Sequence, residues 1–83
     1  MTKSYKFYSD SGHGWLAVKR QELIDLGILD KITHYSYQRG NTVYLEEDCD
    51  MTRFTMAKKE LKIVEGKYQD RSSIRSYDSF KNV

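Results

Sequence analysis

The residues with the clearest potential for chemistry form an acidic run at positions 46–50, which reads Glu-Glu-Asp-Cys-Asp. Carboxylate oxygens are the ligands that Mg²⁺ and Ca²⁺ prefer, but the run lacks the Asp-x-Asp-x-Asp-Gly spacing of an EF-hand loop. A structural role is the simpler interpretation: Asp48 or Asp50 caps a helix that follows, and the other acids favour its positive end. The second interpretation is an acidic patch for a basic partner, formed by Glu46, Glu47, Asp48 and Asp50. The sequence predicts no metal ligands and no cofactor.

The single cysteine is the next candidate, because a thiol near the first turn of a helix can have a lowered pKa. The neighbouring acids disfavour a thiolate at Cys49, and a nucleophile also needs a positioned base. His13 and His34 have no spacing that supports this role, and the three residues together do not match a zinc-ligand pattern. We therefore interpret Cys49 as a small buried apolar residue and His13 as an exposed residue between two turn glycines. The sequence predicts no catalytic residues.

The sharpest binding hypothesis rests on aromatic residues around one predicted hairpin. Tyrosine, tryptophan and arginine are the residues that most often dominate interface energetics. The candidates for partner binding are Tyr35, Tyr37, Arg39 and Tyr44, with Trp15 if that side chain is exposed. The same rings could instead stack on bases, with Arg39 touching a phosphate. A third interpretation is that the inward tyrosines complete a thin core.

Charge is distributed unevenly along the chain, although its formal net charge is only +2. Residues 43–52 carry four acids and no base, whereas residues 53–83 carry eight bases and four acids. These bases could follow a phosphate backbone, or they could form a solvated helix face and tail. The candidates for nucleic-acid contact are Lys58, Lys59, Lys62, Lys67, Arg71 and Arg75.

Local patterns predict the elements that position these residues. Strands are expected at 3–9, 15–18, 33–38 and 42–46, where apolar and polar residues alternate or short apolar runs occur. Turns are expected at 10–14 and 39–41, where glycine occurs with aspartate, serine or asparagine. These connections are too short for parallel crossovers, so the sheet is expected to be antiparallel.

Two helices complete the prediction. The first covers residues 20–26 and ends at Gly27, with Ile28 placed for the apolar contact of a Schellman cap. The second starts near the acidic run and places Met51, Phe54, Ala57 and Leu61 on one face. Another strand opens at Ile63-Val64, and Ile74, Tyr77 and Phe80 dock the polar tail. We expect an α+β fold with four to five antiparallel strands and two helices on one face.

Length and composition bound the remaining possibilities. A chain of 83 residues forms a single domain over 1–83, with residues 70–83 as a loosely docked tail. No apolar run suits a signal peptide or a membrane span. A single cysteine cannot form an internal disulfide, which favours a reducing, cytoplasmic setting.

Three segments carry a resemblance to a known group of proteins: Ser11-Gly-His-Gly-Trp-Leu-Ala-Val18, Ser36-Tyr-Gln-Arg-Gly40 and Val43-Tyr-Leu-Glu-Glu-Asp-Cys-Asp50. Across residues 5–56 the chain resembles a family of short uncharacterised phage and plasmid proteins. That family has no assigned chemistry, so the resemblance implies a mobile-element origin and transfers no site.

The leading functional hypothesis is a non-enzymatic protein that binds and occludes a host protein, such as a component of a CRISPR or restriction system. The first alternative is a small nucleic-acid-binding regulator that uses the hairpin aromatics and the C-terminal bases. The second is a small metal protein or enzyme built on His13, His34 and the acidic run. A homodimer is compatible with all three, and no membrane partner is expected.

Overall fold

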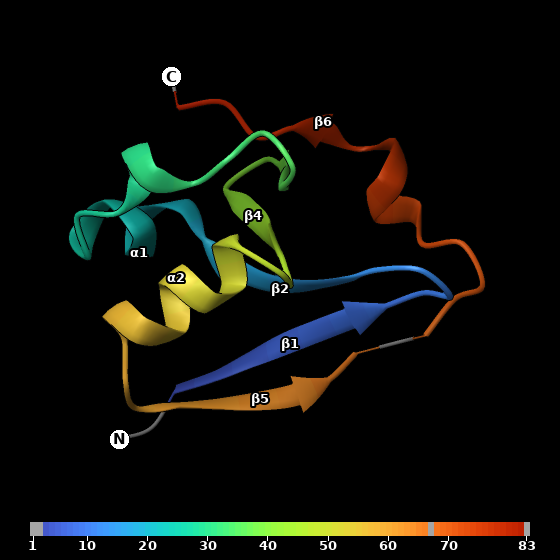
Figure 1. The fold of residues 1–83 in the computed structure, drawn as a ribbon, viewed down its shortest axis with the longest axis horizontal. Coiled ribbons are helices and arrows are strands. Elements are labelled where there is room, and N and C mark those ends of the chain that lie inside the picture. The colour runs from blue at the N-terminus through green and yellow to red at the C-terminus, as the bar shows by residue number, and fades with distance from the viewer. Residues whose placement is uncertain (1–2, 67, 83) are drawn as a thin grey trace.

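The computed structural model describes residues 3–66 and 68–82, which form one mixed sheet with two α-helices (Figure 1). The sheet has six strands in the order β5-β1-β2-β4-β3-β6. The strands are β1 Lys3–Ser9, β2 Gly14–Lys19, β3 Tyr37–Arg39, β4 Thr42–Glu46, β5 Leu61–Glu65 and β6 Asp78–Ser79. The helices are α1 Arg20–Asp25 and α2 Asp50–Ala57, with 3-10 turns at Leu29–Lys31 and Ser73–Ser76. The predicted α+β class is confirmed.

The prediction of a wholly antiparallel sheet is wrong at one edge. Strand β5 runs parallel to β1, with Tyr5 opposite Ile63. The two short turns do join antiparallel neighbours, β1 with β2 and β3 with β4. Strand β5, however, follows α2, and a helix is long enough to return the chain for parallel pairing. The strand count rises to six because β6 pairs with β3 near the end of the chain.

Helix α1 ends as its sequence predicts. Gly27 has a φ of 71°, which is the left-handed conformation that glycine adopts without steric cost. The Ile28 N–H donates to the Leu23 carbonyl at 3.0 Å, and the Gly27 N–H donates to the Ile24 carbonyl at 3.0 Å. These two bonds are those of a Schellman cap. The cap turns the chain so that Ile28 reaches the core.

The predicted strand over 33–38 is wrong for its first half, because residues 33–36 form a turn that is anchored to α2. One carboxylate oxygen of Asp50 accepts hydrogen bonds from the Thr33 N–H at 3.0 Å and from the Thr33 hydroxyl at 2.8 Å. The Ser36 hydroxyl also donates to this oxygen. Side chains that bond to nearby backbone offer the chain an alternative to a strand ladder. Strand β3 therefore begins only at Tyr37.

The predicted cap of the second helix is also wrong. The N-cap residue is Cys49, and its side chain makes no capping bond to the described residues. Asp50 is the first helical residue and is buried, with its carboxylate turned to the 33–36 turn. Glu46 takes over part of the capping role, because its carboxylate accepts the N–H groups of Asp48 at 3.0 Å and Cys49 at 2.9 Å. Cys49 itself is exposed, so its predicted burial is wrong as well.

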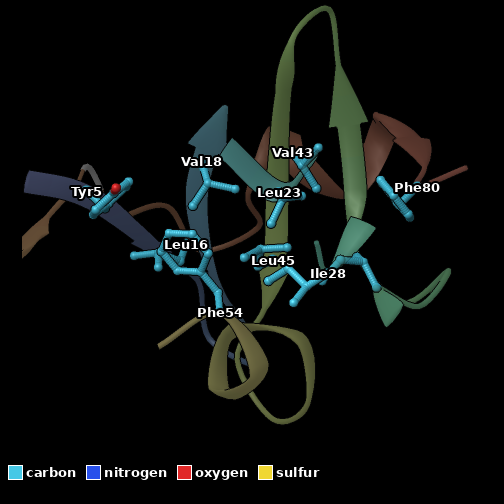
Figure 2. Packing of buried hydrophobic residues seen from close by; sticks show 10 residues of the cluster. Tyr5, Leu16, Val18, Leu23, Ile28, Val43, Leu45, Phe54 and Phe80 are labelled. Atoms are coloured by element: carbon cyan, nitrogen blue, oxygen red, sulfur yellow. The ribbon is translucent and has the colours of Figure 1, made fainter. Parts of the chain in front are cut away.

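The main core lies on the side of the sheet that the two helices cover (Figure 2). Leu16, Val18 and Leu45 point from the central strands toward Leu23 of α1 and Phe54 of α2. The Phe54 ring meets Tyr5 of β1 edge-on, with 5.2 Å between ring centroids. Both helices therefore pack on one face, as predicted, and the opposite face is partly covered by the C-terminal segment, whose Arg75 lies over Trp15.

The C-terminal segment crosses from one edge of the sheet to the other. It leaves β5, passes the β1–β2 turn and reaches β6, as the orange-to-red part of Figure 1 shows. Ile74 and Phe80, two of the three side chains expected to dock this segment, are buried. Phe80 joins the main core, whereas Ile74 lies outside that cluster.

Candidate binding surface on the open sheet face

The face of the sheet opposite the helices, here called the open face, carries four of the five candidates for partner binding: Trp15, Tyr37, Arg39 and Tyr44. Side chains alternate along a strand, and Leu16, Val18, Val43 and Leu45 point to the core. Their neighbours therefore point to the open face. From β1, β2, β4 and β3 these are Ser4, Lys6, Tyr8, Trp15, Ala17, Lys19, Thr42, Tyr44, Glu46, Tyr37 and Arg39.

One hollow of about 220 Å³ lies at the end of this face, next to the β1–β2 turn. We call it the aromatic hollow; its lining residues are His13, Trp15, Tyr35, Tyr37, Glu46 and Arg75. The hollow unites members of all three sets that the sequence had suggested separately: aromatic partner-binding residues, an acid and a C-terminal base. His13, which the second functional alternative had named, lines the hollow as well.

Trp15 forms the floor of the aromatic hollow and is only 2% exposed, so it is not an exposed anchor. The Tyr37 ring meets it edge-on at 6.1 Å, and the His13 ring lies 6.1 Å away. The Arg75 guanidinium covers the indole face at 5.7 Å from the ring centroid. Cations are attracted to the face of an indole ring. The C-terminal segment therefore buries Trp15 on a face that would otherwise leave it open.

Arg75 is held in this place by Asp10. Its Nε and Nη2 atoms donate to the two carboxylate oxygens of Asp10, with an Nη2 distance of 2.9 Å. The same carboxylate accepts the N–H groups of Gly12 at 3.0 Å, His13 at 2.9 Å and Ser72 at 3.0 Å. Asp10 thus closes the β1–β2 turn and ties the C-terminal segment to it.

This pair changes the electrostatics of the hollow. The Arg75 hydrogen bonds, together with the backbone N–H groups, hold the pKa of Asp10 far below its ordinary value. The same contact raises the pKa of Arg75. Arg75, a candidate for nucleic-acid contact, is therefore paired with a carboxylate. Asp10 was missed as a site residue, since an Asp before Ser-Gly is also the ordinary signal of a turn.

Tyr35 forms the exposed rim of the hollow, with 63% of its surface accessible. Its ring lies 4.6 Å from the His34 ring, and its N–H donates to the Thr33 hydroxyl at 3.3 Å. Tyr35 is in the turn and Tyr37 is in β3, so the two do not share one strand face as predicted. Both nevertheless line the hollow, because the turn anchored by Asp50 brings Tyr35 over it.

The other two candidates, Arg39 and Tyr44, lie beside the hollow in a chain of ring contacts. Tyr44 is half-buried, with its ring centroid 5.2 Å from Tyr77 and 6.3 Å from Tyr8. The Arg39 guanidinium lies 5.0 Å from the Tyr77 ring centroid, and its Nη1 donates to the Tyr77 hydroxyl at 3.2 Å. Burial raises the pKa of Tyr44. These contacts hold both candidate side chains against neighbouring rings.

The acidic and basic sets do not form continuous patches. Glu46 lines the hollow and Asp50 is buried, while Glu47 and Asp48 remain exposed. Among the bases, the Lys58 Nζ lies 4.0 Å from Glu22 in the helix layer. Lys59 and Arg71 are exposed, Lys62 is on β5, and Lys67 lies outside the described residues.

Neither a metal cluster nor a bilayer-spanning helix is found in residues 3–66 and 68–82. These residues contain no group of three or more His, Cys, Asp or Glu side chains that could hold a metal ion. The helices of this part of the chain are too short and too polar to cross a membrane.

Comparison of the chain with protein-family models, with curated proteins and with solved structures found no match.

Proposed function

We propose that this protein is a small non-enzymatic binding protein of phage or mobile-element origin that binds and occludes a host protein through the aromatic hollow. A component of an antiviral defence system in the host cytoplasm is the partner that this origin favours. The family resemblance across residues 5–56 supports the origin. The composition and geometry of the hollow support the mode of action.

The observation that carries the proposal is the structure of the rim and floor of the hollow. An exposed Tyr35 projects beside a base made of the buried Trp15 ring and the Tyr37 ring that packs edge-on against it. Tyrosine offers a large contact area at a low entropic cost, because its side chain has few rotatable bonds. Residues that are fixed before binding lose little freedom on association.

The charges of the hollow favour a protein partner over a phosphate backbone at this place. Glu46 lines the hollow, and the Asp10 carboxylate lies directly behind Arg75. A phosphate would meet repulsion from Glu46, whereas Arg75 is already paired with Asp10. A protein surface with polar groups of both signs can match such a mixed site.

The experiment is an affinity capture from a host lysate, with and without nuclease, followed by a binding measurement on the purified partner. The test variant is Tyr35→Ala, and the matched control is Tyr68→Ala, which removes a tyrosine that is 55% exposed but does not line the hollow. We expect Tyr35→Ala to weaken binding at least about ten-fold, as for an interface anchor. Equal affinity for both variants contradicts the proposed surface, and capture that depends on nucleic acid contradicts the proposed partner.

A further inference from the structure

The open face carries a second hollow, separate from the aromatic hollow and formed mainly by β1, β2 and β4. Its volume is about 290 Å³. The short side chain of Ala17 lies in the middle of this face, with Lys6 and Tyr8 on one side and Tyr44 on the other. We call this hollow the lysine groove; its open-face residues are Ser4, Lys6, Tyr8, Ala17, Lys19, Thr42 and Tyr44.

Strand register places a row of basic residues across the sheet at this groove. Lys62 of β5 is opposite Ser4 of β1, and Lys19 of β2 is opposite Thr42, which is opposite Arg39 of β3. Adjacent strands lie about 4.8 Å apart, so the row from Lys62 to Arg39 spans roughly 19 Å across four strand gaps. All three of its basic side chains are exposed.

The neighbouring row carries another lysine and two tyrosines. Lys6 is opposite Val64 of β5, and Ala17 is opposite Tyr44, which is opposite Tyr37. Neither row contains a carboxylate. Within residues 3–66 and 68–82, no carboxylate pairs with Lys6, Lys19 or Lys62. Lys3 also lines the groove, but its Nζ is paired with Glu22 at 2.8 Å.

We infer that the lysine groove is a binding site for single-stranded nucleic acid. The phosphates lie along Lys62, Lys19 and Arg39, with Lys6 beside them, and bases stack on the Tyr8 and Tyr44 rings. A basic groove next to aromatic rings on an open sheet is the arrangement that binds single strands, because unstacked bases offer their flat faces. The site shares no lining residue with the aromatic hollow. Failure of one proposal therefore leaves the other testable.

The positive charge of the lysine groove favours a polyanion as its ligand. The two rows together present four cations on one open face. Each neutralised phosphate of a single strand lowers the salt slope of binding by about 0.7, so four contacts give a slope of about −2.8. Affinity should therefore fall roughly 50-fold between about 50 and 200 mM salt.

The first test measures fluorescence anisotropy of a labelled oligothymidine of about 12 nucleotides, a length within the usual site sizes. We expect Lys6→Ala/Lys19→Ala to halve the salt slope of binding, so that affinity falls only about seven-fold between about 50 and 200 mM salt. The matched control is Lys31→Ala/Arg53→Ala, which removes two charges from a hollow in the helix layer. Absence of binding at about 50 mM salt, or an equal effect of both double variants, overturns the inference.

The second test separates nucleic acid from other polyanions. We expect Tyr8→Leu to weaken oligothymidine binding about ten-fold, because it removes a stacking surface but keeps apolar bulk. Circular dichroism of the variant checks that the fold is retained. Binding of inorganic polyphosphate should not change in this variant. If polyphosphate or polyglutamate binds as tightly as the oligonucleotide and Tyr8→Leu affects none of them, the groove recognises negative charge alone and the inference is wrong.

Discussion

Replacement of Asp50 tests whether this residue anchors the 33–36 turn rather than caps α2. Its carboxylate accepts three hydrogen bonds, from the Thr33 N–H, the Thr33 hydroxyl and the Ser36 hydroxyl. In Asp50→Ala the Thr33 hydroxyl can turn to solvent, because Thr33 is half-buried. The Ser36 hydroxyl, on a residue that is 0% exposed, and the Thr33 N–H lose their partner. Each buried hydrogen-bond donor that is left without an acceptor costs about 1–3 kcal/mol, so the free energy of unfolding should fall by about 3 kcal/mol.

Chemical denaturation followed by tyrosine and tryptophan fluorescence measures this loss. A domain of this size loses about 4–8 °C of melting temperature per kcal/mol, so thermal unfolding should show a shift of roughly 12–24 °C. Asp50→Asn should cost less, because its amide oxygen still accepts hydrogen bonds. Asp48→Ala is the matched control and should stay within about 0.5 kcal/mol, since Asp48 is exposed.

A double-mutant cycle sharpens the test. Ser36→Ala removes the same bond from its other end, so the double variant should cost clearly less than the sum of the two single variants. If Asp50→Ala costs no more than Asp48→Ala, or if the cycle is additive, the anchoring role is refuted. Because the turn places Tyr35 on the rim of the aromatic hollow, Asp50→Ala should also weaken partner binding.

Three further predictions concern the Asp10–Arg75 ion pair, the Cys49 thiol and the core. Arg75 keeps the pKa of Asp10 below its ordinary value of 3.8, so the ion pair stabilises the fold above that pH and this contribution is lost on acidification. The melting temperature of Arg75→Ala should therefore fall less steeply than that of the parent below about pH 4, and parallel curves would contradict this. Cys49 is exposed, so a thiol reagent should modify it in the native protein, whereas reaction only after unfolding would contradict the exposed position. Phe54→Ala should cost about 3–5 kcal/mol, measured by urea denaturation against Met56→Ala, whose side chain is 72% exposed; similar losses would show that Phe54 is not a core residue.

Local signals predicted the parts of the fold that depend on near neighbours. Gly27 ends α1 and residues 39–41 join β3 to β4, both as predicted. In each case the types of the turn residues themselves determine the backbone conformation. The parallel pairing of β5 with β1 could not be predicted in this way. It depends on contacts between residues about 58 positions apart, such as Tyr5 and Ile63, and no turn residue encodes them.

The candidate site was predicted in its residue types but not in its geometry. Tyr35, Tyr37 and Trp15 do line one hollow. Burial of Trp15 could not be expected from its own apolar run, because Arg75 of the C-terminal segment covers it. The role of Asp10 was hidden for the same reason: its partner lies 65 positions away. A charged pair at that distance leaves no periodic signal in the sequence.

The order of strands in the sheet has a consequence for how the protein is made. Both outer strands, β5 and β6, come from the last third of the described chain. A nascent chain that has been translated only to residue 60 therefore exposes the free edges of β1 and β3, and exposed strand edges promote aggregation. At about 5–20 residues per second, synthesis of the next 20 residues takes roughly one to four seconds. The aromatic hollow is complete only after Arg75, the last of its lining residues along the chain, has left the ribosome.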